Sequence, residues 1–151
     1  MIEFLEIAKE EALLAMEKGE IPVGVVIVKD GIIIGKAHNL KETLKDGTAH
    51  AEILAIKEAA KYIDDWRLNG CEMYVTLEPC PMCASAIVQS RISKVHISTF
   101  NKDMGACGSV IDLLDNRRLK SFVDVKWLYD EECADLLIKF FNNRRKKDYN
   151  I

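Results

Sequence analysis

The sequence Pro79-Cys80-Pro81-Met82-Cys83 decides the fold class of this chain. Two cysteines separated by two residues can both face one metal ion when they lie on the first turn of a helix. Pro81 suits that turn because its missing N–H needs no intrahelical partner there. His50, in the run His50-Ala51-Glu52, can supply a third ligand from a separate helix. Three protein ligands leave a tetrahedral Zn²⁺ one open position for water, which is the arrangement of a catalytic site.

Glu52 lies two residues beyond His50 and is better placed as an acid/base than as a fourth ligand. Zinc lowers the pKa of its bound water towards ~7, and a neighbouring carboxylate can move the released proton to a substrate nitrogen. An acid in a first helical turn also stabilises the helix dipole, and the two roles are compatible. His-x-Glu followed by Pro-Cys-x-x-Cys is the established signature of zinc-dependent nucleobase deaminases. A lone Cys-x-x-Cys would equally fit a redox pair or half of a structural zinc site.

Composition indicates an ordinary globular chain. The 151 residues are 49% hydrophobic and 30% charged, which predicts one domain covering 1–151. No apolar run approaches the roughly 20 residues of a membrane helix, and the acidic start lacks the basic region of a signal peptide. We therefore expect a cytoplasmic protein without a membrane partner. The odd number of five cysteines agrees, with three expected to be buried thiols: Cys71, Cys107 and Cys133.

The charge of the chain is uneven. The formal net charge is −3, yet a basic stretch near the end contains Lys139, Arg144, Arg145, Lys146 and Lys147. Such a stretch can bind phosphates even when the whole chain is acidic. It is also what a solvated helix end looks like, because cations there suit the helix dipole. The basic stretch alone leaves both interpretations open.

Hydrophobic patterning predicts alternating helices and strands. The expected helices cover 2–18, 49–63, 81–90, 109–114 and 131–143, and the expected strands cover 23–28, 32–39, 71–76, 94–99 and 123–127. Thr48 is the candidate N-cap of the second helix, and Asp30-Gly31 is a hairpin turn. A hairpin followed by strand–helix alternation predicts an α/β fold with a mixed five-stranded sheet and helices on both faces. The helices that carry the metal ligands should then start side by side at one edge of the sheet.

The chain resembles the bacterial tRNA-specific adenosine deaminases of the cytidine deaminase-like superfamily. The resemblance rests on these segments: Glu20-Ile21-Pro22-Val23-Gly24, Thr48 to Glu52, Tyr74-Val75-Thr76-Leu77-Glu78-Pro79-Cys80-Pro81-Met82-Cys83, Gly105-Ala106-Cys107-Gly108-Ser109, and Phe140-Phe141 with Arg144-Arg145. It spans nearly the whole chain and implies the three-layer α/β/α fold of that superfamily.

The resemblance implies hydrolytic deamination of the wobble adenosine in a tRNA anticodon stem-loop, giving inosine and ammonia, by a homodimer. It implies one Zn²⁺ per chain with a bound water or hydroxide, held by His50, Cys80 and Cys83, with Glu52 as the proton shuttle. The implied substrate contacts are Asn39, Ile21, Ala49, Phe141, Arg144 and Arg145. The local sequence also fits Asn39 as a turn-forming residue. Phe140-Phe141 equally fits the core.

One loop departs from the family pattern. Similar proteins often carry an acidic residue where Asn101 stands and a lysine where Asp103 stands, so the RNA contacts of this loop are left open. Two other functions compete with the main interpretation. A deaminase of guanine, cytosine or a nucleotide would share the zinc motif but would not need the basic stretch. A non-catalytic zinc module would need a fourth protein ligand.

Overall fold

The computed structural model describes residues 2–149. The helices are α1 (Ile2–Glu17), α2 (Ala51–Ile63), α3 (Pro81–Gln89) and α4 (Glu131–Tyr149). The strands are β1 (Gly24–Lys29), β2 (Ile32–His38), β3 (Glu72–Val75), β4 (Lys94–Ile97), β5 (Asp115–Asn116), β6 (Ser121–Phe122) and β7 (Asp124–Trp127). None of the helices in this part of the chain combines the length and apolar character needed to cross a membrane.

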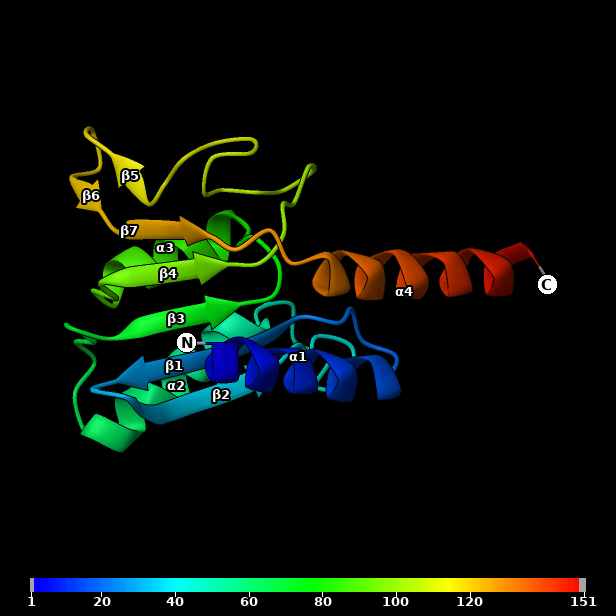
Figure 1. Cartoon of the computed structure of the whole chain (residues 1–151), viewed down its shortest axis with the longest axis horizontal. Coiled ribbons are helices and arrows are strands. Elements are labelled where there is room, and N and C mark those ends of the chain that lie inside the picture. Colours follow the sequence, from blue (N-terminus) through cyan, green and yellow to red (C-terminus); the bar gives the residue numbers. More distant parts are fainter. Residues whose placement is uncertain (1, 150–151) are drawn as a thin grey trace.

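The predicted mixed five-stranded sheet is confirmed. The strands lie in the order β2-β1-β3-β4-β7, with β1 antiparallel to both neighbours and β3, β4 and β7 mutually parallel. The first two strands form the expected hairpin, whose turn residues Asp30 and Gly31 both have positive φ. The carboxyl ends of the three parallel strands point to one edge of the sheet (Figure 1). Residues that follow these strands therefore meet at that edge.

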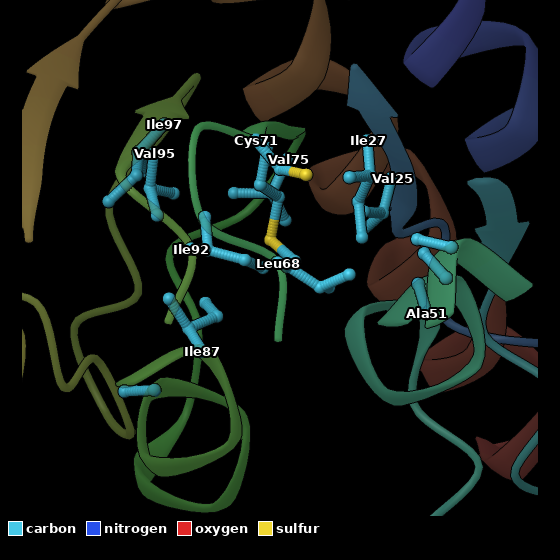
Figure 2. Close-up of a cluster of buried hydrophobic side chains, with 14 of the residues drawn as sticks. Val25, Ile27, Ala51, Leu68, Cys71, Val75, Ile87, Ile92, Val95 and Ile97 are labelled. Atoms are coloured by element: carbon cyan, nitrogen blue, oxygen red, sulfur yellow. The ribbon is translucent and has the colours of Figure 1, made fainter. Parts of the chain in front are cut away.

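The sheet buries apolar side chains on both faces. The larger cluster lies between the sheet and helices α2 and α3, and it unites alternate residues of β1, β3 and β4 with helix residues such as Ala55 and Ile87. Figure 2 shows Val25 and Ile27 on one side of this layer and Val95 and Ile97 on the other. A smaller cluster on the opposite face packs α1 against the sheet through Ala8. This is the three-layer arrangement that the resemblance implied.

Two glycines let helices approach the sheet closely. A Cβ added to Gly24 on β1 would lie 1.9 Å from the carbonyl oxygen of Ala8 on α1. A Cβ added to Gly35 on β2 would lie 2.6 Å from the carbonyl oxygen of Ala55 on α2. Real Cβ atoms do not make such contacts, so both helix–sheet distances require glycine. The spacing of α2 from the sheet also fixes where its first residues, including His50, lie.

The junction between β7 and α4 is tied to α1 by a buried lysine. The Lys9 ammonium lies 2.8 Å from a carboxylate oxygen of Asp130 and within 3.2 Å of Glu6 and Glu132. Burial acts to lower the pKa of Lys9, but its hydrogen bonds with these three acids outweigh burial and hold the pKa above its usual range. Beyond this junction α4 extends past the end of the sheet (Figure 1).

Three local predictions are corrected. Thr48 does not cap α2: its N–H and hydroxyl both donate to Asp46, at 2.8 and 2.7 Å, and His50 occupies the N-cap position instead. The helix expected at 109–114 is absent because the hydroxyl of Ser109 donates to Glu78 and cannot cap a helix. A two-stranded hairpin of β5 and β6 follows instead. The last helix does not stop at 143 but reaches residue 149, since the basic residues after 143 are good helix formers.

Replacing Gly24 with alanine tests the close packing of α1. We expect Gly24→Ala to lower the free energy of unfolding by about 1–3 kcal/mol, because the new methyl group must displace the α1 backbone. Chemical denaturation measures the change. Gly47→Ala is the matched control, since a Cβ there meets nothing within 4 Å. Equal stability of the two variants would contradict the packing described above.

Candidate active site

The starts of α2 and α3 bring three metal-ligating side chains together. His50 is the N-cap of α2, and Cys80 is the N-cap of α3. Pro81 occupies the first turn of α3 as predicted, and Cys83 follows in the same turn. The free N–H groups of a helix start attract negative charge, so they favour a thiolate at this position. The sequence prediction that His50, Cys80 and Cys83 meet is confirmed.

The spacing of these side chains fits a tetrahedral zinc ion. The Nδ1 atom of His50 lies 3.6 Å from the sulfur of Cys80 and 3.5 Å from the sulfur of Cys83. Zn–S bonds of about 2.3 Å and Zn–N bonds of about 2.0–2.1 Å at tetrahedral angles require N–S separations of roughly 3.6 Å. All three ligand atoms lie within 4.8 Å of one another. One nitrogen and two sulfurs are also a donor set that zinc prefers.

The two thiols of the cluster differ in how readily they lose their protons. Hydrogen bonding from Cys83 is the largest influence on the pKa of Cys80 and lowers it to about 4 against the effect of burial, with His50 contributing further. The same contact raises the pKa of the Cys83 thiol. A metal ion bound here must displace a proton from Cys83. Zinc affinity is therefore expected to fall as the pH is lowered.

Glu52 lies in the first turn of α2, beside this cluster. Its side chain is buried, with 4% of the residue exposed. Burial raises the pKa of its carboxyl above the usual range, although a hydrogen bond with Cys83 opposes the shift. A carboxyl whose pKa is raised towards neutrality can both accept and donate a proton, which suits an acid/base group.

A pocket of about 250 Å³ opens over the cluster. Its lining includes His50, Glu52 and Cys80, together with the apolar side chains of Ile21, Val23, Leu77 and Met104 and the polar residues Asn39, Lys41, Glu78 and Asn101. This volume lies below the roughly 300–1,000 Å³ typical of sites for drug-sized ligands. One nucleobase is a suitable occupant. A larger hollow of about 610 Å³ between α1 and α4 contains none of the cluster residues.

Asn39 and Ile21 line the pocket, as the resemblance implied. The Asn39 side chain accepts a hydrogen bond from the Lys41 N–H at 3.1 Å, and its amide group donates to the Ile21 carbonyl at 3.5 Å. Asn39 thus forms a turn and also lines the pocket, so its two sequence interpretations are compatible. Ala49 is buried and outside the lining residues, and its carbonyl accepts a hydrogen bond from Leu40.

Two buried glutamates that the sequence analysis left without a role shape the pocket. Glu78 accepts hydrogen bonds from the backbone N–H groups of Asn101, Cys107 and Ser109, so it holds the loop that closes one side of the pocket. Gly105 is required beside it, because a Cβ there would lie 2.5 Å from a Glu78 oxygen. The sequence signal for the role of Glu78 was an acidic residue directly before Pro79, at the end of the predicted strand.

Glu20 holds the opposite side in the same way. Its carboxylate accepts hydrogen bonds from the N–H groups of Glu42 and Thr43 at 3.0 and 2.7 Å. Burial acts to raise the pKa of Glu20, but these backbone hydrogen bonds outweigh burial and lower it. The loop that Glu20 holds includes Lys41, a pocket residue that the sequence analysis also missed.

Phe141, Arg144 and Arg145 lie on α4, outside the residues that line the pocket. The Arg144 guanidinium lies over the Phe140 ring at 5.7 Å, next to the end of α1. Phe140 is buried, as the core interpretation expected, whereas the Phe141 side chain is exposed. Among the described residues, neither His38 nor His96 joins the metal cluster.

Comparison with known proteins identifies relatives along most of the chain. Residues 1–99 match the family model of the cytidine and deoxycytidylate deaminase zinc-binding region. A tRNA-specific adenosine deaminase from Aquifex aeolicus (strain VF5) is 54% identical over 144 residues, which cover 94% of each chain. One from Bacillus subtilis (strain 168) is 46% identical over 145 residues, which cover 95% of this chain and 90% of the relative.

Solved structures agree with these relatives. A structure from a study of A-to-I editing by tRNA:A34 deaminases at the wobble position of transfer RNA superimposes with a TM-score of 0.87. It is 38% identical and the match covers 91% of this chain and 100% of the other. A guanine deaminase from Bacillus subtilis gives a TM-score of 0.64 at 40% identity, over 67% of this chain and 65% of the other.

Removal of one thiol tests the metal cluster. We expect Cys83→Ala to lose zinc, because two remaining ligands cannot hold the ion tightly. Elemental analysis of the purified protein measures this against one zinc per chain in the wild type. Cys71→Ala is the matched control, since Cys71 is a buried free thiol that is not part of the cluster. Undiminished zinc in Cys83→Ala would refute the ligand assignment.

Proposed function

This chain belongs to the tRNA-specific adenosine deaminases of the cytidine and deoxycytidylate deaminase family, and we propose that it hydrolyses the wobble adenosine of a tRNA anticodon to inosine and ammonia. The observation that carries this proposal is the meeting of three zinc ligands and a buried glutamate in one base-sized pocket. A closed structural zinc site needs a fourth protein ligand, and among the described residues only His50, Cys80 and Cys83 come together, which argues against a non-catalytic module.

Different residues of the pocket contribute to different steps of the reaction. His50, Cys80 and Cys83 would hold a zinc ion, which would supply a Lewis acid for the activation of water at neutral pH. Glu52 accepts a proton from that water and delivers it to a ring nitrogen of adenine, which makes the amine-bearing carbon more electrophilic. The oxygen of the water bonds to that carbon, Glu52 takes the proton of the resulting hydroxyl group and passes it to the amine, and the C–N bond breaks as ammonia leaves. The pKa of Glu52, raised by burial, suits this exchange in both directions.

The pocket walls hold and orient the base. Ile21 and Leu77 offer apolar surface to the faces of a purine ring, and the Asn39 amide can hydrogen-bond its edge. Burial of the base in this pocket excludes bulk water from the reacting carbon. The hydrogen bonds to Glu20 and Glu78 keep both walls in place before the substrate arrives, which reduces the cost of ordering them on binding.

The larger RNA needs contacts outside the pocket, and α4 supplies cations for them. Arg144, Arg145, Lys146 and Lys147 are exposed along its last turns. We also propose that two copies of the chain form a homodimer, supported by exposed apolar side chains at Val110, Ile111 and Leu119 that a second subunit would cover. The tRNA substrate and five free cysteines support a site of action in the cytoplasm.

Mass spectrometry of tRNA incubated with the protein tests the reaction. We expect a gain of about one dalton at the wobble adenosine, as oxygen replaces NH, catalysed by the zinc-loaded enzyme. Glu52→Ala should keep its zinc and lose at least about a hundredfold in rate, the typical contribution of a positioned acid/base. Free guanine and cytidine serve as competing substrates. Turnover of these and not of the RNA would instead support a small-molecule deaminase.

The cations of α4 give a separate prediction for binding. Replacing Arg144 and Arg145 with alanine should weaken RNA binding and reduce the slope of log affinity against log salt concentration by roughly 1.4, since each lost single-strand phosphate contact removes about 0.7. Zinc content should not change. Arg117 and Arg118 form a matched exposed pair on the β5–β6 hairpin, and their replacement should leave the salt slope unaltered. Equal slopes in both double variants would show that α4 does not bind phosphates.

A further inference from the structure

Three aromatic rings cluster beside the pocket at the carboxyl ends of β4 and β7. The Phe100 ring is stacked on Trp127 with centroids 4.6 Å apart, and Tyr129 lies 5.6 Å from Phe100 and 6.5 Å from Trp127. We call Phe100, Trp127 and Tyr129 the aromatic cluster. None of these residues has a role in the reaction described above.

The cluster is anchored on one side and open on the other. Trp127 packs against the hydrophobic core. Phe100 and Tyr129 are 47% and 66% exposed, so a large part of each ring faces solvent. Tyr129 also has φ of 53°, a left-handed backbone conformation that is uncommon for a bulky residue. The fold thus holds an exposed ring in a conformation that costs free energy, which is a feature enriched at functional sites.

Backbone hydrogen bonds fix the cluster relative to the pocket. The N–H groups of Leu128 and Asp130 donate to the carbonyls of Ile97 and Ser98, which ties the segment around Tyr129 to the end of β4. Phe100 is followed directly by Asn101, whose N–H donates to Glu78 and whose side chain lines the pocket. Phe100 therefore lies one residue from the pocket lining, and its ring contacts join Trp127 and Tyr129 to this side of the pocket.

The chemistry of this surface favours a neutral flat ligand. The exposed charged neighbours have mixed sign, with Lys102 next to Asp103 in the loop and Glu131 at the start of α4. Such a surface has no excess of cations to attract a phosphate. Exposed aromatic faces, in contrast, bind nucleobases by stacking, with little dependence on which base is present.

We propose that the aromatic cluster stacks the unpaired nucleobase next to the target adenosine in the opened RNA loop. The inference rests on the proposed function and specifies one more part of its substrate site. When the adenosine leaves the loop and enters the pocket, the adjacent base loses a stacking partner. Phe100 adjoins the pocket residue Asn101, and stacking of the adjacent base on the Phe100 and Tyr129 rings would replace the lost contact. The open state of the loop is stabilised as a result.

A double-mutant cycle between protein and RNA tests this proposal. The protein variant is Phe100→Leu, which keeps an apolar side chain but removes the ring. The RNA variants are anticodon stem-loops in which the nucleotide before or after the target adenosine is abasic. The rate constant kcat/KM for inosine formation is measured for each combination, with zinc content and oligomeric mass as checks on each protein.

We expect Phe100→Leu to lower kcat/KM on the intact stem-loop by about five- to 150-fold, the range reported by alanine substitution at base-stacking aromatics. On one of the two abasic RNAs the same substitution should have little further effect, because the base that it stacks is already missing. Phe100→Tyr should retain most of the activity. Tyr129→Asn, which suits the left-handed backbone, should reproduce the loss.

Tyr62→Leu is the matched control, because Tyr62 is a 63% exposed aromatic residue near the end of α2, outside the pocket lining. An equal loss in Tyr62→Leu, or losses that multiply on both abasic RNAs, would overturn the stacking proposal while the deaminase function stood. Conversion of a wild-type dimer to monomer by Phe100→Leu, without coupling to either abasic site, would assign the cluster to a subunit interface and also overturn it. Absence of inosine with wild-type protein would overturn both the proposed function and this inference.

Discussion

The site depends on one constraint, which is that two helices begin at the same point on the edge of the sheet. The N-cap residues of α2 and α3 are His50 and Cys80, so both ligands lie at the positive end of a helix dipole. Their backbones take extended conformations, with ψ of 152° and 173°, and turn their side chains toward each other before each helix starts. Any shift of α2 along the sheet would separate Nδ1 of His50 from the two sulfurs. Gly35 helps to fix the position of α2, because its lack of a Cβ lets the helix backbone pack directly against β2.

The sequence was sufficient to predict the five-stranded sheet and the metal cluster, for physical reasons. Strands such as 23–28 are rich in β-branched residues, and the spacing of Cys80 and Cys83 indicates a catalytic metal site once it is combined with His50 and Glu52. The ends of helices were less accurate, because local hydrogen bonds compete for the same groups. Thr48 resembled an N-cap until the structure placed its hydroxyl on Asp46. Ser109 resembled another, but its hydroxyl belongs to Glu78, which lies 31 residues earlier in the chain. Such long-range partners leave no periodic pattern in the sequence.

Residues of the proposed RNA surface were harder to predict from the sequence than those of the pocket. The basic residues of α4 are neighbours in the sequence and lie in one helix. The aromatic cluster, in contrast, combines the loop after β4 with the end of β7 and the segment after it. Phe100, Trp127 and Tyr129 are spread over 30 positions and share no motif. Their meeting follows only from the parallel pairing of β4 with β7, in which Ile97 lies opposite Trp127. A surface built from strand ends becomes visible only when the order of the strands is known.

Three buried glutamates show how the fold assigns different tasks to one residue type. Glu20 and Glu78 each accept hydrogen bonds from backbone N–H groups of a loop, and in Glu20 these hydrogen bonds outweigh burial and lower the pKa of the carboxyl. Glu52 is as well buried, but it lies beside the Cys83 thiol and the other metal ligands, and burial raises the pKa of its carboxyl. A carboxylate held by several backbone donors serves as a fixed support. A carboxyl with a raised pKa exchanges its proton more readily near neutral pH. The hydrogen-bond partners of each carboxyl, which the sequence does not display, therefore separate the one glutamate suited to proton transfer from the two that hold the pocket walls.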